Sequence, residues 1–181
     1  KPDMWALAAV YSKLPQGVYH IESAPQGAGL AQLALGWSLC DYYYSQAQIQ
    51  NPPTVKTLVV SSDVLAKVQP FTDATCLVRD LINDPAENMG PAELAGAAQH
   101  LADQCGATFH SVTGTELEKE FPAMYAVGKA SHRDGHMIEL NWGDDTHPKL
   151  SLVGKGVCFD TGGLDIKSDA GMRYMQKDMG G

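Results

Sequence analysis

Two lysines and two aspartates near the end of the chain are of residue types that can hold and use a divalent cation. Lys155, Asp160, Lys167 and Asp178 follow one another within a short stretch. Carboxylate oxygens are the usual ligands of hard cations, and zinc also accepts nitrogen. A lysine can ligate only as its neutral amine, so burial and the charge of the metal must remove its proton. The same side chains could instead neutralise each other as ion pairs, so their types leave both chemistries open.

The segment that must position these side chains is short, apolar and rich in glycine. Leu150, Leu152 and Val153 form the kind of run that a buried strand needs. Glycines flank Lys155, and glycine inside a strand usually marks a bulge or a close backbone approach. We expect a strand that starts at Leu150, ends at Asp160 in a Gly-Gly turn, and presents polar groups there.

The same residues resemble a known sequence signature. The segments VGKGVCFDTGGLDIK at residues 153–167 and KDMGG at 177–181 resemble that of the leucyl aminopeptidase family, also called cytosol aminopeptidases, which are dinuclear metallo-exopeptidases. A second block, VRDLINDPAENMGP at residues 78–91, resembles the start of the family's catalytic domain. The resemblance covers residues 71–181 well and the first seventy residues loosely.

The resemblance implies a role for each polar residue of the signature. Lys155 and Asp178 would ligate one metal ion, and Asp160 would bridge two. Lys167 would be the catalytic lysine that polarises the scissile carbonyl and stabilises its oxyanion. Met175 matches a residue that lines the pocket for the first side chain of the substrate, so substrate binding is expected at all five positions. The implied cofactors are two divalent ions per subunit, either zinc, manganese or magnesium.

The resemblance also implies an activity and an assembly. The expected enzyme is a cytoplasmic homo-hexamer that releases N-terminal amino acids, leucine-like ones preferred, from peptide substrates by metal-activated water. The family's remaining ligands lie in a downstream Asn-Thr-Asp-Ala-Glu-Gly-Arg segment that the 181 residues do not contain. We therefore expect the chain to be a piece of a longer enzyme, and the piece alone to be inactive.

Simpler interpretations of these residues remain open. Lys155 and Asp160 taken alone could form a salt bridge at a strand end. Lys167 and Asp178 could be an exposed ion pair on a loop and a helix. Met175 shares an i, i+3, i+7 spacing with two other methionines, which is also typical of a helix stripe in a core.

The net charge and the length of the apolar runs disfavour several classes of protein. The formal net charge is −8 and the sequence pI is about 5.1, which disfavours nucleic-acid and anionic-membrane binding. No run of residues has the length of a transmembrane helix. Two rivals stay open: another dinuclear metallohydrolase such as a phosphoesterase, and a non-catalytic binding relative on the same scaffold.

The four cysteines show no Cys-x-x-Cys spacing, so we expect reduced and mostly buried thiols. Cys158 could act as a nucleophile or a soft ligand, but no nearby histidine supports this role, and a small buried side chain is expected. The histidines show no His-Glu-x-x-His spacing, and none is assigned to metal.

Predicted strands alternate with predicted helices along the chain. We expect strands over 18–21, 58–60, 108–112 and 136–142, and helices over 29–44, 74–82 and 91–105, with a short helix capped by Thr115 and Glu118. This alternation predicts an α/β sandwich with a largely parallel or mixed sheet. Together with the resemblance it predicts an incomplete three-layer α/β/α metallopeptidase catalytic domain over 67–181, preceded over 1–66 by part of a smaller α/β N-terminal domain.

Overall fold

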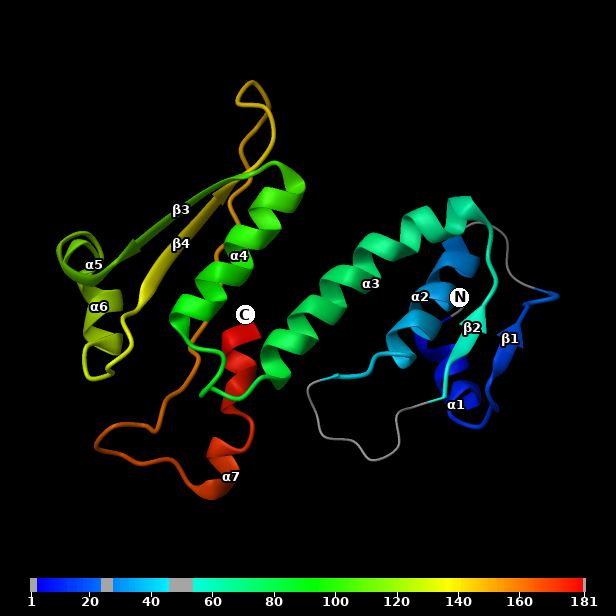
Figure 1. Cartoon of the computed structure of the whole chain (residues 1–181), viewed down its shortest axis with the longest axis horizontal. Helices are drawn as coiled ribbons and strands as arrows, with labels where there is room; N and C mark the ends of the chain where they lie inside the picture. Colours follow the sequence, from blue (N-terminus) through cyan, green and yellow to red (C-terminus); the bar gives the residue numbers. More distant parts are fainter. Residues whose placement is uncertain (1–2, 24–27, 46–53, 181) are drawn as a thin grey trace. The chain divides into compact units, whose positions relative to one another are not determined.

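The computed structural model describes residues 3–23, 28–45 and 54–180, which fall into two compact units (Figure 1). The units are Lys1–Asp80 and Leu81–Gly181, and each combines helices with a two-stranded sheet. The predicted α/β class is confirmed, and the small sheets with their helices are consistent with a partial α/β domain. The predicted domain boundary between residues 66 and 67 stays a prediction. Among the described helices none is long and apolar enough to cross a membrane.

The first unit is a small parallel sheet with helices. Its elements are η1 (Met4–Leu7), α1 (Ala8–Tyr11), β1 (Gly17–Tyr19), α2 (Ala28–Cys40), β2 (Lys56–Leu58) and most of α3 (Ser62–Asn83). Strands β1 and β2 pair in parallel with Gly17 opposite Lys56. The buried side chains of α2 and the ring of Tyr11 form the core of this unit.

An aromatic pair fixes α2 in that core. The rings of Tyr11 and Trp37 meet edge to face with their centroids 5.0 Å apart, and the Lys56 ammonium lies 4.2 Å from the centroid of the Tyr11 ring. The Trp37 Nε1–H donates to the carbonyl oxygen of Lys56 at 3.0 Å, which ties α2 to β2. The indole therefore buries its ring without leaving a polar group unpaired.

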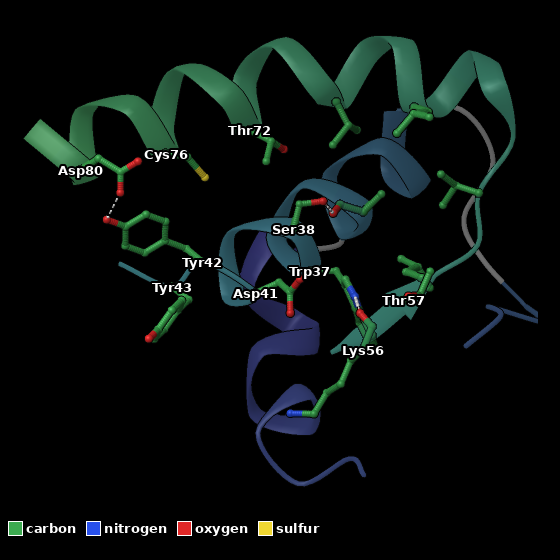
Figure 2. Close-up of a pocket in the computed structure, with 15 residues that line it drawn as sticks. Trp37, Ser38, Asp41, Tyr42, Tyr43, Lys56, Thr57, Thr72, Cys76 and Asp80 are labelled. Atoms are coloured by element: carbon green, nitrogen blue, oxygen red, sulfur yellow. Dashed lines mark hydrogen bonds between the residues drawn. The ribbon is translucent and has the colours of Figure 1, made fainter. Parts of the chain in front are cut away.

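A cavity of about 530 Å³ lies among α2, β2 and α3 (Figure 2). Some polar groups of its lining bind one another, because Tyr42 donates to Asp80 and Trp37 donates to the carbonyl oxygen of Lys56. The hydroxyl of Thr72 is buried and has no hydrogen-bond partner among the described residues. None of the residues predicted to bind metal or substrate lines this cavity.

The second unit contains the signature residues. Its elements are α4 (Pro91–Cys105), β3 (Thr108–Thr113), α5 (Gly114–Glu120), α6 (Pro122–Gly128), β4 (His136–Asn141), α7 (Asp169–Met172) and η2 (Met175–Gly180). Strands β3 and β4 are antiparallel with Thr108 opposite Asn141, and α4 packs on both of them. Val112 and Leu117 are almost completely buried in this core.

Helix α4 begins and ends where the sequence predicts. Gly90 is its N-cap residue, Pro91 occupies the first helical position, and the Glu93 carboxylate accepts the Gly90 N–H at 3.0 Å. At the other end Gly106 takes the left-handed conformation with φ 67°, which a side chain would disfavour. Strong terminal signals therefore fix this helix locally.

Other predicted elements need correction. Helix α3 starts twelve residues before the predicted 74–82 segment, with Pro70 inside it. Helix α2 ends at Cys40 rather than at residue 44, and α6 was not predicted. The predicted cap at Thr115 is wrong, because the N-cap of α5 is Thr113, with φ −148° and no side-chain cap bond. Tertiary packing outweighs local propensity at such ends.

Arg133 connects two loops of the second unit. Its Nη1 donates to the carbonyl oxygen of Ala86 at 2.6 Å, and its Nη2 donates to that of Glu87. A planar guanidinium can serve two such acceptors at once, whereas an ammonium cannot reproduce this geometry. The Pro85–Gly90 turn is thereby held against the loop before β4.

Replacing Arg133 by alanine is expected to lower the free energy of unfolding by about 1.5–3 kcal/mol, the range for hydrogen bonds to charged groups. Arg133→Lys is expected to recover less than half of the lost free energy of unfolding, because it keeps the positive charge but not the two-donor geometry of the guanidinium. Urea unfolding followed by circular dichroism measures both values, and the exposed Lys119→Ala serves as control. A stability equal to that of the parent in Arg133→Ala would contradict the assigned role.

Candidate functional site

The four predicted polar residues form two ion pairs. Lys167 Nζ lies 2.8 Å from Asp160 Oδ2, and Lys155 Nζ lies 3.5 Å from Asp178 Oδ1. Lys167 is the most sheltered of the four, with 29% of its side chain exposed, against 70% for Lys155. Each predicted cation thus has a predicted carboxylate as its partner, although sequence alone does not fix which cation meets which carboxylate.

Asp160 organises the loop between the two members of its ion pair. Its Oδ1 accepts the backbone N–H of Gly162 at 2.7 Å, and the N–H of Lys167 donates to the Thr161 carbonyl oxygen at 2.9 Å. Gly162 has φ 93°, and a Cβ placed there would stand 2.2 Å from the carbonyl oxygen of Asp165. Glycine is therefore required at this position, and the turn returns Lys167 to Asp160.

The electrostatics of the site favour an ionised Asp160. The Lys167 hydrogen bond, followed by the Gly162 N–H, holds the pKa of the Asp160 carboxyl below its usual range. The positive charges of Lys167 and Lys155 act in the same direction. Because Lys155 contributes, the two ion pairs lie within electrostatic reach of each other.

The predicted strand from Leu150 to Asp160 is wrong for this structure. Residues 149–160 are irregular, and Leu150, Leu152 and Val153 are 82%, 89% and 97% exposed. A strand requires a neighbouring strand to take its N–H and C=O groups, and no described residue pairs with this segment. An apolar run of this kind forms a buried strand only where a neighbouring strand is present.

Met175 lies at the start of η2 and is half-buried, while Met179 in the same element is buried. The alternative interpretation, in which the spaced methionines pack in a core, therefore holds for Met179. The predicted pocket role of Met175 stays a prediction.

Cys158 is half-buried, and its Sγ lies 3.8 Å from the carbonyl oxygen of Gly156. Burial raises the pKa of this thiol, and the Glu93 carboxylate adds to the effect although Arg133 opposes it. A raised thiol pKa disfavours a nucleophilic thiolate. All four cysteines are free; Cys105 is exposed, so the expectation of mostly buried thiols was too strong.

The donor atoms of the site suit a divalent cation in part. The ionised Asp160 carboxylate has about four lone-pair positions, and two of these accept Gly162 and Lys167. Asp178 supplies further oxygens, and Lys155 supplies a nitrogen once it is deprotonated. These are donor types that zinc and manganese accept. The described residues contain no group of three His, Cys, Asp or Glu side chains placed to hold an ion, so the donors present amount to part of a coordination shell.

Comparison with known proteins gives a consistent result. Residues 76–181 match the cytosol aminopeptidase family, catalytic domain. A probable cytosol aminopeptidase of Corynebacterium diphtheriae is 32% identical over 177 residues, which are 91% of this chain and 35% of the relative. The chain thus spans about a third of the length of that curated relative.

Solved structures show the same similarity. The crystal structure of the cytosol aminopeptidase from Coxiella burnetii is 39% identical with a TM-score of 0.91, and the match covers 99% of this chain and 40% of that chain. The bottromycin maturation enzyme BotP in complex with Mn is 28% identical with a TM-score of 0.81, over 98% of this chain and 41% of that one.

Proposed function

Because this chain belongs to the cytosol aminopeptidase family, we propose that the whole protein is a metal-dependent aminopeptidase. It releases N-terminal amino acids, leucine-like ones preferred, from peptides. The match of residues 76–181 to the catalytic domain carries this proposal. The pairing of both signature lysines with both signature aspartates supports it, because the residues of the predicted site lie together.

The proposed cofactors are two divalent ions, with Lys155, Asp160 and Asp178 among their ligands. The complex of BotP with Mn supports manganese, and the donor types also suit zinc and magnesium. Bound ions of this kind lower the pKa of a coordinated water and orient the amine and carbonyl of a peptide. Asp160 is suited to its share because the lowered pKa of its carboxyl favours the ionised form, which is the form that binds a cation.

Lys167 is the proposed catalytic residue. Its ammonium is held at 2.8 Å from the Asp160 carboxylate, so its position is fixed before a substrate arrives. A fixed positive charge beside a scissile carbonyl stabilises the negative charge that develops on the oxygen during attack. Asp160 orients this donor, and Met175 contributes to the pocket for the first side chain of the substrate.

The whole protein is further proposed to be a homo-hexamer in the cytoplasm. The cytoplasmic assignment draws on the name of the relatives, which are cytosol aminopeptidases. The two rival functions, a phosphoesterase and a non-catalytic binding protein, are not favoured, because the family match is to a peptidase catalytic domain.

A paired assay tests the proposal. The whole protein with Mn²⁺ is expected to hydrolyse a leucyl anilide and to leave a nitrophenyl phosphate ester intact, and EDTA is expected to stop the reaction. Turnover of the phosphate ester alone would support the rival metallohydrolase. Absence of both activities in a protein that binds Mn²⁺ would support a binding role.

A further inference from the structure

Gly156 marks a close contact between the signature segment and helix α4. A Cβ placed on Gly156 would stand 2.8 Å from Leu94 Cδ2 and 3.6 Å from the carbonyl oxygen of Met179. Real Cβ atoms essentially never approach another atom as closely as the first of these distances. The missing side chain therefore lets Leu94 lie directly on the backbone of residue 156.

The neighbours of this contact are the two members of one ion pair. Lys155 precedes Gly156 and Asp178 precedes Met179, so the same contact lies next to both backbones that carry the pair. The side chains of Lys155 and Asp178 are 70% and 51% exposed, and their nitrogen–oxygen distance is 3.5 Å. An exposed pair of this kind contributes little to its own placement. Backbone packing must supply the position instead.

Helix α4 is a rigid base for that packing. Its first turn is fixed by the Glu93–Gly90 hydrogen bond, and Arg133 lies against Gly90, since a Cβ on Gly90 would stand 2.4 Å from Arg133 Nη1. The next residue after Leu94, Ala95, is 6% exposed, and Met179 is 5% exposed. Leu94 thus extends from an anchored turn onto a segment that has no strand partner among the described residues.

We propose that Leu94 and Gly156 are positioning residues that set the separation of Lys155 and Asp178. The pair's identity as metal ligands rests on the proposed function. Neither Leu94 nor Gly156 touches a substrate in this role. They act through the backbone, as outer contacts commonly do when they orient the ligands of a metal.

The contact predicts a graded response to side-chain size. Gly156→Ala is expected to weaken Mn²⁺ binding less than threefold, because Leu94 Cδ2 is the mobile end of its side chain and can turn aside. Gly156→Val is expected to weaken it about 10- to 100-fold, since a branched side chain also crowds the Met179 carbonyl. Equilibrium dialysis of the whole protein against Mn²⁺ measures both values without reference to activity.

A compensating variant separates positioning from simple damage. Leu94→Ala removes the atom that a side chain at residue 156 meets, so the double variant Leu94→Ala, Gly156→Val is expected to bind Mn²⁺ at least threefold more tightly than Gly156→Val alone. Gly96→Val is the matched control, because a Cβ on Gly96 in the same helix has no atom within 4 Å. The control is expected to bind Mn²⁺ as the parent does.

The outcomes distinguish this inference from the proposed function. Unchanged Mn²⁺ binding in Gly156→Val would overturn the positioning role, whatever the activity of the parent. Loss of binding that Leu94→Ala does not relieve would overturn it too, because the effect would then not pass through Leu94. A parent protein that binds Mn²⁺ but hydrolyses no peptide would overturn the proposed function and leave the dialysis comparison intact. Thermal unfolding of each variant checks that it is folded.

Discussion

Lys167→Ala in the whole protein is expected to reduce the turnover of a leucyl anilide by about 100- to 1,000-fold, the usual loss when one oxyanion donor is removed. The Lys167 ammonium lies against Asp160 at 2.8 Å and is the most sheltered charge of the site. Its removal takes away the donor that would stabilise the developing oxyanion. It leaves the Asp160, Lys155 and Asp178 donors in place, so the Mn²⁺ content is expected to stay close to that of the parent.

Measuring kcat and the Mn²⁺ content of each variant together separates a catalytic role of Lys167 from a role in holding the metal. Lys167→Arg keeps the positive charge with a different donor geometry and is expected to restore only part of kcat. The exposed Lys119→Ala is the matched control and should leave both values unchanged. A loss of metal in parallel with kcat would show that Lys167 acts by holding Asp160. Retention of most of the turnover in Lys167→Ala would refute the catalytic role.

Asp160→Asn is expected to weaken Mn²⁺ binding by at least about 100-fold and to abolish peptidase activity with it. The amide has the shape of the carboxylate and can still accept the Gly162 N–H, so the turn is retained. The substitution removes the negative charge of the Asp160 carboxylate, the form that Lys167, Gly162 and Lys155 stabilise. A divalent cation binds a neutral amide oxygen much more weakly than a carboxylate.

The control for this variant lies on the same loop. Asp165→Asn removes a charge five residues away, from an exposed residue that the proposed coordination does not include. It is expected to bind Mn²⁺ normally. Equilibrium dialysis and circular dichroism of both variants separate ligand loss from unfolding. Equal Mn²⁺ binding by Asp160→Asn and the parent would remove Asp160 from the proposed ligand set.

The sequence predicted best the elements whose ends carry their own signals. Pro91 marks the start of α4 through its fixed φ, Gly106 marks its end because glycine tolerates a positive φ, and short runs with apolar residues mark β3 and β4. The predicted strand at Leu150 failed for the opposite reason. Whether an apolar run becomes a strand depends on a neighbour that the run itself does not encode.

The candidate site was predictable in its residue types but not in its pairing. The residue types left a metal site and ion pairs both open, and the structure brings all four charged residues into two ion pairs. Lys155 and Asp178 are separated in the sequence, and they meet only because of the path that the chain takes past α4. The contact of Leu94 with Gly156 had no distinct sequence signal, because Leu94 reads only as one member of a helix stripe.

The turn after Asp160 has a practical consequence for anyone who diversifies this protein by directed evolution. A residue other than glycine at position 162 would collide with the Asp165 carbonyl, so randomising it would fill a library with misfolded clones. Leu164 and Ile166 lie on the same turn with their side chains in open solvent. Among the described residues of this turn, positions 164 and 166 therefore leave more room for new side chains than position 162 does.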